Sequence, residues 1–402
     1  MRILFIVDSL PYPILGGASL RNYNLLRRIA SVNEVWLAAF AMNAEQTESV
    51  SHFQEFCAGV EVEMPGPQSA LSNIPGLVSY FLRGTPPELR FLDSNPLKRK
   101  ISKLVSKIKF DVIHIDQVHM GLYLKTIPDN QHPRTIWGLH DYDFNKFRQI
   151  IELEPKKARK FRLWLNNQLI YYWEPRHAEK FGNIITVSTL DKQLLLSKNP
   201  KLKIEVIPNG VDTHALLPIA EDNESQVLLF VGNMAYLPCS DGVIHFYEHI
   251  FPLIKKVIPS VELWVVGKDP PDQIRELKNK GVLVTGRVDD VKPYYEKSKV
   301  CIVPLRAGSG TRLKILEAMA LGRPVVSTSI GCEGLDITNG KELMVADTPE
   351  LFAKKTIELL TDLTLRKQIT DQAREFVVKN HEWNMVAQKL IDVYEQVASI
   401  NQ

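Results

Sequence analysis

The 402-residue sequence is 45% hydrophobic and 24% charged, which is typical of a globular protein and long enough for two domains. A formal net charge of only +3 argues against a general nucleic-acid binder. Four widely spaced cysteines without a Cys-x-x-Cys pair argue against a zinc centre or a disulfide framework and fit a reducing cytosol. No apolar stretch approaches the roughly 18 residues that span a bilayer.

Short apolar runs alternate with helical patterns from the first residues onward. Residues 3–7 form an apolar run that meets Asp8 without a small-residue cleavage site, so we expect a first strand rather than a signal peptide. A helix is expected at 18–30. Further strands are expected at 34–39, 60–63, 112–115, 135–139, 184–187 and 205–207. This alternation predicts a parallel sheet with helices on both faces and ligands at the carboxyl ends of its strands.

Three loops at expected strand ends contain residue types that suit ligand binding. Gly16 and Gly17 open the first helix, where backbone amides can hold an anion, although a plain turn is an alternative. His140 follows the strand at 135–139, although a lone histidine is often structural. The segment 208–212, PNGVD, contains the strong turn signal Asn-Gly, and we favour a structural role for it.

Two basic segments lie between these loops. Residues 97–109 place apolar side chains on one helical face and lysines elsewhere, and residues 156–164 combine basic with aromatic side chains. Such segments can lie on an anionic lipid surface, but a solvated helix face explains them equally simply. A peripheral membrane contact through 97–109 and 156–164 is therefore one of two alternatives.

The alternating pattern restarts after residues 215–226, which are polar and acidic around one proline and are expected to form a linker. Strands are then expected at 227–232, 261–267, 282–285, 300–304, 325–327 and 343–345, with helices between them. A last helical pattern covers about 383–400. The sequence therefore predicts a second doubly wound parallel sheet.

The most informative stretch is 306–328, RAGSGTRLKILEAMALGRPVVST. A loop with Gly308 and Gly310 connects an apolar strand to a helix expected at about 312–321, and Gly322 is suited to end that helix. Strand, glycine loop and helix together form a unit that binds phosphates at the helix N-terminus.

One acidic residue of this helix, Glu317, falls within the apolar stripe. A carboxylate there needs a partner, and an i,i+3 pair with Lys314 is one alternative. The other is that Glu317 accepts hydrogen bonds from a ligand's hydroxyl groups, while Arg312 and Lys314 hold the phosphates of the same ligand.

The run LEAMALGRPVVST resembles the signature of retaining, GT-B-type glycosyltransferases of family four, also called group 1, in which E-x7-E precedes A-M-A-x-G-x-P-V-V. Glu317 falls on the second glutamate of that signature, and Ser309 replaces the first. The resemblance implies that Glu317 binds the nucleotide ribose. It also implies that Gly16 and Gly17 lie against the donor diphosphate and that His140 acts at the reacting side of the sugar.

The resemblance assigns further loops to the donor. Residues 286–288 resemble the loop that frames the nucleotide base, and Gly232 precedes a segment in which the family often has an arginine and a lysine. Neither occurs here, so we expect Arg312 and Lys314 to supply the missing charge. The expected catalytic residues are His140, Arg312 and Lys314, and the expected substrate-binding residues are Gly16, Gly17, Gly232, Gly286, Arg287, Val288, Gly308, Ser309, Gly310, Thr311, Leu313 and Glu317.

The fold that the resemblance implies is GT-B, in which two doubly wound, Rossmann-like domains face each other across a cleft. The expected boundaries are 1–214 for an acceptor-side domain, 215–226 for the linker, 227–380 for a donor-side domain, and 381–402 for a helix that crosses back to the first domain.

The implied activity is that of a retaining hexosyltransferase, which moves a sugar from a nucleoside-diphosphate donor, such as a UDP- or GDP-sugar, to a glycan or lipid-linked acceptor. Bacterial cell-surface or exopolysaccharide synthesis in the cytoplasm, with peripheral membrane contact as an alternative, is the expected setting. No Asp-x-Asp metal clamp is expected, and no other cofactor.

The alternatives are a nucleotide-sugar epimerase of the same fold and a non-catalytic sugar-binding subunit. A nicotinamide dehydrogenase is disfavoured because no G-x-G-x-x-G follows the first strand.

Overall fold

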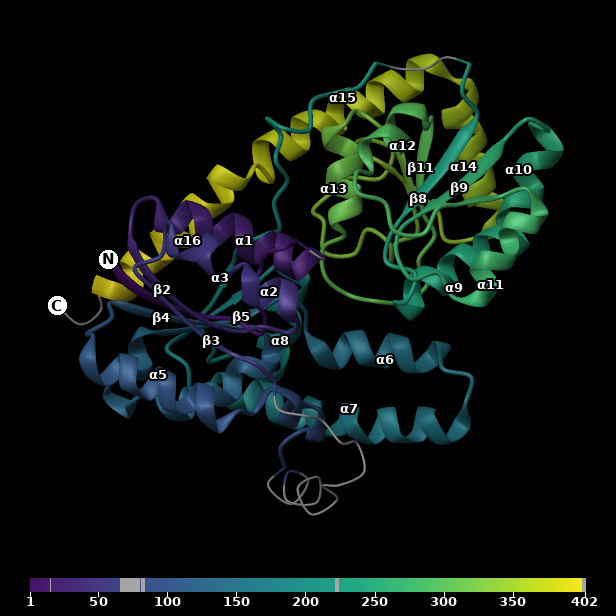
Figure 1. The fold of residues 1–402 in the computed structure, drawn as a ribbon. Coiled ribbons are helices and arrows are strands. Elements are labelled where there is room, and N and C mark those ends of the chain that lie inside the picture. The colour runs from purple at the N-terminus through teal and green to yellow at the C-terminus, as the bar shows by residue number, and fades with distance from the viewer. Residues whose placement is uncertain (15, 66–79, 81–83, 221–223, 400–402) are drawn as a thin grey trace. The chain divides into compact units, whose positions relative to one another are not determined.

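The computed structural model describes residues 1–14, 16–65, 80, 84–220 and 224–399. The chain forms two compact units, each an α/β unit around one parallel sheet (Figure 1). The first unit consists of Met1–Arg148, Lys156–Asn209 and Trp383–Gln402. The second consists of Gln149–Pro155 and Gly210–Glu382.

The first unit contains a seven-stranded sheet in the order β3-β2-β1-β4-β5-β6-β7. Every pairing between neighbouring strands is parallel, so the carboxyl ends of the strands meet at one edge of the sheet. The strands are β1 (Arg2–Ile6), β2 (Glu34–Phe40), β3 (Gly59–Glu63), β4 (Val112–Asp116), β5 (Thr135–Leu139), β6 (Asn183–Thr186) and β7 (Ile204–Val206).

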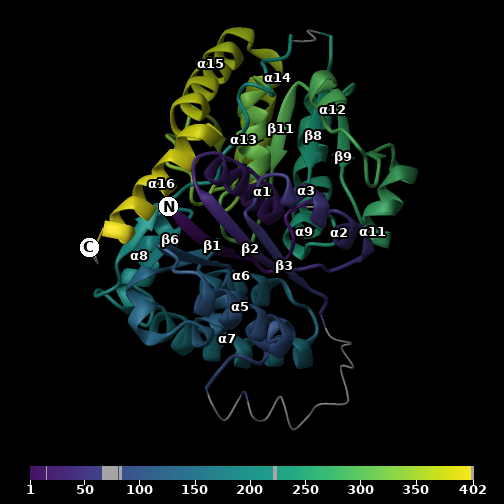
Figure 2. The ribbon, with the colours of Figure 1, turned by 60° about the vertical axis from the view of Figure 1, so that its left-hand side comes forward.

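Helices cover both faces of this sheet. One face packs against α1 (Gly17–Ala30), α3 (Val50–Gln54) and α16 (Trp383–Ser399), and α16 lies beside α1 in both views (Figures 1 and 2). The other face packs against α5 (Asn95–Lys107), α8 (Thr189–Lys198) and the end of α7 (Lys157–Ala178). The remaining helices and 3₁₀ turns are α2 (Ala44–Glu48), η1 (Pro87–Leu92), η2 (Val118–Thr126), η3 (Asp129–Arg134) and α6 (Asp143–Leu153).

The second unit contains a six-stranded parallel sheet in the order β10-β9-β8-β11-β12-β13. Its strands are β8 (Val227–Val231), β9 (Glu262–Val266), β10 (Leu283–Val284), β11 (Val300–Val303), β12 (Val325–Ser327) and β13 (Met344–Val345). Its helices are α9 (Leu237–His245), η4 (Phe246–Ile250), α10 (Phe251–Val257), α11 (Asp272–Arg275), η5 (Glu276–Lys280), α12 (Lys292–Lys297), α13 (Leu313–Ala320), α14 (Pro349–Thr361) and α15 (Leu363–Asn380). One continuous apolar cluster fills this unit around the sheet.

The strands expected from the apolar runs are all present, and no strand end differs from its expected position by more than one residue. The prediction of parallel sheets with helices on both faces is confirmed. Part of the expected linker, residues 221–223, lies outside the described residues, as does the end of the last expected helix at residue 400.

Candidate active site

A glycine loop connects β11 to α13 in the second unit. The φ angle is 111° at Gly308 and 79° at Gly310, a region of backbone conformation that favours glycine. A Cβ atom at position 308 would lie 2.9 Å from Nη2 of Arg312, so the guanidinium packs directly against the loop. Nη1 of Arg312 donates a hydrogen bond to the Ser309 carbonyl, which ties the loop to the helix that follows it.

The guanidinium of Arg312 is only partly satisfied by the protein. Its Nε and Nη2 atoms are buried, and among the described residues neither donates a hydrogen bond. Leaving buried donors unpaired costs free energy, so a phosphate that accepts from both would be bound favourably. Arg312 is also the N-cap residue of α13, where the helix dipole favours an anion.

Lys314 points toward the end of β8. Its Nζ lies 4.1 Å from the ring centroid of Phe230 and 3.7 Å from Sγ of Cys239. A Cβ atom on Gly232 would come within 2.8 Å of this ammonium group, so the glycine leaves room for it. Burial lowers the pKa of Lys314. A cation therefore lies beside Gly232, where the segment 232–242 itself contains neither arginine nor lysine.

Glu317 lies at the margin of the buried face of α13. Leu316 and Ala320 are fully buried, whereas Glu317 and Leu313 are partly exposed. Within the part of the chain that the structure describes, no hydrogen bond or ion pair engages its carboxylate, so the i,i+3 pair with Lys314 does not form. Burial raises the pKa of Glu317 to about 7, although the charge of Lys314 opposes this shift.

The remaining expected donor residues surround these side chains. Gly286 has a φ of 78°, and its carbonyl accepts a hydrogen bond from the Gly267 amide at 3.2 Å. A Cβ at Gly267 would lie 1.8 Å from the Gly232 carbonyl oxygen, so only glycine allows the ends of β8 and β9 to approach this closely. Arg287 next to it is exposed and Val288 is partly buried, whereas Ser309 and Thr311 in the glycine loop are buried.

In the first unit, His140 lies directly after β5. Its Nε2 is 2.9 Å from Oδ2 of Asp116, and its Nδ1 is 2.9 Å from the side-chain Nε2 of Gln117. Because an amide nitrogen can only donate, Nδ1 of His140 accepts and Nε2–H donates to the carboxylate. The imidazole is therefore held in one tautomer and one orientation.

Asp116, at the end of β4, lies at the centre of this cluster, although the sequence pattern did not mark it as functional. Asn22 also donates to it at 2.8 Å, and a Cβ on Gly138 would lie 2.3 Å from its Oδ1. Burial alone would raise the pKa of Asp116, but His140 and His114 more than offset burial and hold the pKa well below its usual range. The sequence did contain one signal, because Asp116 directly follows the strand expected at 112–115, and acidic residues at strand ends can be functional.

Asp8, which follows β1, is a second carboxyl group near His140. Burial, and then the charge of Asp116, raises the pKa of Asp8 to about 6, while His140 opposes this shift. Two carboxyl groups with pKa values pushed in opposite directions thus lie near one imidazole, as is common where protons or developing charges are handled.

The glycines at the start of α1 offer fewer free backbone amides to an anion than the sequence suggested. The helix begins at Gly17, and the φ of Gly16 is 178°, which is extended backbone open to any residue. The Gly16 amide donates to Oγ of Ser19 at 2.9 Å, so it is already used. The Gly17 amide is the first of the helix and has no intrahelical partner. Only Gly17 of the pair therefore offers an amide that the helix leaves unbonded.

The segment 208–212 has the structural role that its turn signal indicated. Arg21 donates to the Pro208 carbonyl at 2.7 Å and to Oδ1 of Asn209 at 3.0 Å. Oδ1 of Asp212 accepts from the Ala215 amide at 2.9 Å. These contacts fix the chain where it leaves β7.

The expectation of a metal-free site rested on the absence of an Asp-x-Asp motif, and this was wrong, because Asp141 and Asp143 form one shortly after β5. Asp141 and Asp143 both form ion pairs with Nζ of Lys146. Their charges raise the pKa of Lys146 even though burial acts in the other direction. The ammonium group thus occupies the place between the two carboxylates, and this donor set does not suit a divalent cation.

The basic segments 97–109 and 156–164 differ in what they expose. In the first, Leu97, Ile101 and Val105 are buried in the core, so its apolar face is covered. In the second, Phe161 is 64% and Trp164 47% exposed, and their rings stack with centroids 5.9 Å apart. The apolar side chains of 97–109 therefore belong to the core of the unit, whereas 156–164 exposes aromatic rings. No helix among the described residues is both long and apolar enough to cross a bilayer.

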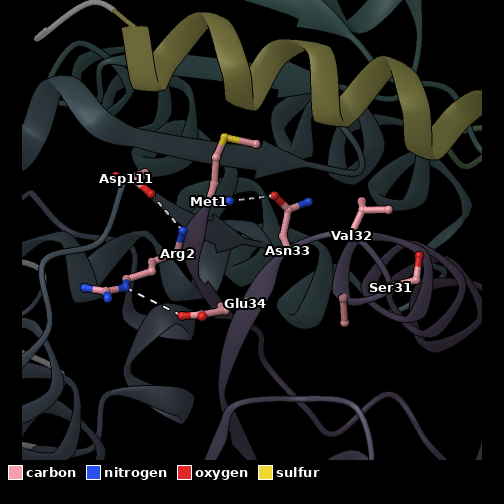
Figure 3. Close-up of a pocket in the computed structure, with 8 residues that line it drawn as sticks. Met1, Arg2, Ser31, Val32, Asn33, Glu34 and Asp111 are labelled. Carbon is pink, nitrogen blue, oxygen red and sulfur yellow. Dashed lines mark hydrogen bonds and ion pairs between the residues drawn. The ribbon is translucent and has the colours of Figure 1, made fainter.

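A hollow of about 580 Å³ lies at the opposite edge of the first sheet (Figure 3). Its lining includes the start of β1, where the Arg2 amide donates to Asp111, and the start of β2, where Glu34 pairs with Arg2. In parallel sheets of this kind ligands bind at the carboxyl ends of the strands. This hollow lies at the amino ends and is not part of the candidate site.

Two family models match the chain. The model described as Glycosyltransferase Family 4 matches residues 15–215, and the model described as Glycosyl transferases group 1 matches residues 225–362. The chain therefore belongs to the group 1, family 4 glycosyltransferases, as the signature around Glu317 implied.

Solved structures show the fold. Sucrose-phosphate synthase from Thermosynechococcus elongatus is 17% identical and superimposes with a TM-score of 0.72 over 98% of each chain. Anabaena HepE, solved in complex with UDP and glucose, is 16% identical and gives a TM-score of 0.63 over 98% of this chain and 100% of that one. The predicted fold class, GT-B with two parallel-sheet α/β domains, is confirmed.

Curated relatives match over part of their length. An uncharacterized 44.6 kDa protein in the cps region of Klebsiella pneumoniae is 28% identical over 229 residues, which are 53% of this chain and 58% of the relative. Phosphatidyl-myo-inositol mannosyltransferase of Mycobacterium tuberculosis is 27% identical over 239 residues, 56% of this chain and 62% of the relative. The match therefore spans less than two thirds of either relative.

Proposed function

We propose that the chain is a retaining glycosyltransferase that moves a sugar from a nucleoside-diphosphate donor to a glycan or lipid-linked acceptor in bacterial surface-polysaccharide synthesis. Family membership supports sugar transfer. The cps-region relative and the mannosyltransferase relative support a bacterial glycan or glycolipid as the product.

One observation carries the proposal. Glu317 has no partner for its carboxylate among the described residues, and Arg312, at the start of the same helix, leaves two buried donors unused. An acceptor group and a cation with free donors, on one short helix after a glycine loop, match the ribose hydroxyls and the phosphates of a nucleoside diphosphate.

Each group has a role in the transfer. Glu317 accepts hydrogen bonds from the ribose, which places the diphosphate near Arg312, Lys314 and the amides of 308–311. Negative charge develops on the diphosphate as the sugar bond breaks, and fixed cations and amides stabilise it without reorganising. His140, oriented by Asp116, contacts the donor sugar and stabilises its reacting side.

A thermal-shift screen with UDP, GDP, ADP and dTDP tests donor binding. A ligand present at about 100 times its Kd adds about 2.7 kcal/mol to the free energy of unfolding, which corresponds to roughly 5–10 °C in Tm for units of this size. One of the four nucleotides should give such a shift. If none of them does, the proposal is wrong.

Transfer itself needs a second measurement, because two alternatives share donor binding. A non-hydrolysing epimerase of the same fold would convert the donor sugar without any acceptor. A non-catalytic subunit, which the serine at position 309 makes worth testing, would bind the nucleotide and turn nothing over. Incubation of the matching nucleotide sugar with an extract of bacterial glycolipids should give a glycosylated product with retained anomeric configuration.

We also propose that the peripheral membrane contact, if formed, uses 156–164 rather than 97–109. An interfacial surface combines exposed aromatic rings with lysines and arginines. Of the two segments, 156–164 exposes such rings, and 97–109 does not.

A further inference from the structure

A second candidate binding site lies along α7, outside the donor-binding residues. A cavity of about 560 Å³ opens between this helix, η2 and the turn at Gly84 and Thr85. Its wall contains the apolar and aromatic side chains of Leu122, Leu169 and Trp173. A cavity of this size and character can hold a small organic ligand or the headgroup of a lipid.

Three cations line this cavity: Lys125 from η2, and Arg176 and Lys180 from the end of α7 and the turn after it. All three are exposed, and no acidic residue is among the described residues that line the cavity. Among the described residues, none of the three forms an ion pair with a carboxylate. Lys180 and Lys125 both act on His177 at the cavity wall, where, after burial, they help to lower its pKa to about 4.

A second hollow, in the second unit, is also lined by cations, including Arg323, Arg366 and Arg374, but these cations have acceptors within the protein. There, each guanidinium donates to backbone carbonyl groups, so its charge serves to hold the chain together. Within the part of the chain that the structure describes, Lys125, Arg176 and Lys180 donate to no such carbonyl groups, so their charge is available to a ligand.

The surface next to the cavity is aromatic. Tyr172 lines the cavity and is 57% exposed, and the guanidinium of Arg176 lies 5.9 Å from its ring centroid. Phe161, Trp164 and Leu165 are exposed further toward the start of the same helix. At 3.6 residues per turn, positions 161, 165, 172 and 176 follow one face of α7. Aromatic residues beside cations are typical of the water–lipid interface.

We propose that this cavity binds the phosphate group of an anionic lipid, with the exposed rings of α7 resting in the headgroup region. The phosphate accepts hydrogen bonds from Lys125, Arg176 and Lys180, while Tyr172 and Trp173 contact the glycerol and the start of the acyl chains. A free phosphate would use the same cations but not the aromatic wall. The inference rests on the proposed membrane contact of 156–164 and names its ligand, but it is independent of the proposed sugar transfer, because binding to lipid is measured without donor or acceptor.

Vesicle co-sedimentation tests the proposal on the full chain. Wild-type protein should bind vesicles of phosphatidylcholine with one third phosphatidylglycerol and should not bind phosphatidylcholine alone. Each cation near an anionic surface adds about fivefold to binding. The triple variant Lys125→Gln, Arg176→Gln, Lys180→Gln should therefore lose at least about 100-fold in vesicle affinity, with an unchanged melting temperature and unchanged nucleotide binding.

A matched control removes three charges from α5 and the turn that follows it, on the same face of the sheet. Lys103, Lys107 and Lys109 are exposed and line neither cavity, and their change to Gln should cost less than threefold. If the control loses as much as the cavity variant, or if the cavity variant binds vesicles like wild type, the proposal is overturned. Phe161→Ser with Trp164→Ser should weaken binding to vesicles but not to a short-chain lipid.

Calorimetry with soluble ligands separates the two sources of phosphate. Dihexanoyl phosphatidylglycerol below its micellar concentration should bind wild type at least tenfold more tightly than inorganic phosphate at equal ionic strength, and the triple variant should lose this binding. Equal affinity for inorganic phosphate would mean that the cavity is a site for free phosphate and would overturn the lipid assignment.

Discussion

At the scale of single residues, the candidate site depends on side chains that the protein leaves unsatisfied. Buried polar groups in folded proteins almost always have partners, so each exception calls for an explanation. Arg312, with two buried donors that no described residue accepts from, is such an exception. Glu317, at the margin of the buried face, also has no hydrogen bond or ion pair to its carboxylate among the described residues, and a bound nucleotide would satisfy both side chains.

The first prediction concerns Glu317→Gln. Charge-assisted hydrogen bonds to ribose are worth roughly 1.5–3 kcal/mol, so nucleotide affinity should fall about ten- to hundredfold. Because burial raises the pKa of Glu317 to about 7, wild-type affinity should also increase as the pH rises from 6 to 8, and the variant should show no such increase.

The measurement is nucleotide Kd by calorimetry at several pH values, with Glu276→Gln as a control that removes an exposed acid from the same unit. The raised pKa means that the unliganded fold loses stability as the pH rises from the unfolded pKa of about 4.3 toward 7, so the variant should melt no lower than wild type at pH 8. Unchanged affinity together with a lower melting temperature would show that Glu317 is structural.

The second prediction concerns His140→Ala. The imidazole is held by Asp116 and Gln117 in the first unit, whereas the expected ribose and phosphate ligands belong to the second. The variant should lower kcat by about 100-fold or more, typical for loss of a positioned catalytic group, and change the Kd for free nucleotide less than threefold.

Gln117→Leu provides a companion to this test. It removes the donor to Nδ1 and leaves the Asp116 contact, so the tautomer becomes free and kcat should fall by a smaller factor than in His140→Ala. Gln117 has a φ of 77°, uncommon for a non-glycine residue, and such conformations persist where the surroundings hold them. Equal loss of kcat and nucleotide affinity in His140→Ala would place the histidine at the nucleotide instead.

At the scale of elements, short helices and strand ends decide which charges are available. α13 is only 8 residues long, yet it begins at Arg312 and places Glu317 one turn later at the margin of its buried face. α5 and α7 both carry many cations, but α5 buries its apolar side chains in the core and α7 leaves several in solvent.

The third prediction concerns Glu174→Gln on α7. Glu174 is 0% exposed, and both of its carboxylate oxygens lack hydrogen bonds of good geometry among the described residues. Burial, and then the charge of Asp143, raises the pKa of Glu174 well above its usual range. An acid whose pKa is raised by folding does not lower the free energy of unfolding at pH values below its unfolded pKa of about 4.3. As the pH rises from there toward the folded pKa, the free energy of unfolding falls.

The variant should therefore melt above wild type at pH 8, and the difference should shrink as the pH is lowered toward 5. Differential scanning fluorimetry across this range measures it, with the exposed Glu395→Gln on α16 as a control expected to change little. A variant that melts below wild type at pH 8 would mean that the buried carboxylate stabilises the fold in its ionised form, which contradicts the prediction.

At the scale of the whole molecule, the charge for the diphosphate comes from the chain itself. Arg312 and Lys314 lie at one glycine loop, and the Asp-x-Asp triplet of residues 141–143 is neutralised by Lys146. Net charge is small, so no strong overall field attracts the donor, and local donors must bind it.

The fourth prediction follows from this arrangement. Transfer activity should survive dialysis against EDTA, because cations and amides of the chain replace a metal ion at the leaving diphosphate. The assay compares rates with and without chelator, and with added Mn²⁺ or Mg²⁺. Activity that disappears with EDTA and returns only with a divalent cation would contradict it.

The sequence by itself determined the strands, the glycine loop and the signature helix, because their signals are local. Buried parallel strands appear as apolar runs, and positive φ angles appear as Gly308 and Gly310. The helical spacing of the apolar residues also placed Glu317 within the apolar stripe of its helix. These features depend on neighbours within a few positions, so composition and spacing express them.

Only the tertiary structure decided which distant side chains meet. Asp116 and His140 are 24 positions apart in the sequence, and they become partners because β4 and β5 are adjacent parallel strands with Asp116 paired to Gly138. Helical spacing would allow Lys314 to pair with Glu317, but its ammonium group lies over the ring of Phe230 on strand β8 instead. Contacts between elements depend on how the elements pack and on which of several possible partners a side chain contacts. The sequence pattern of one element does not show which partner that is.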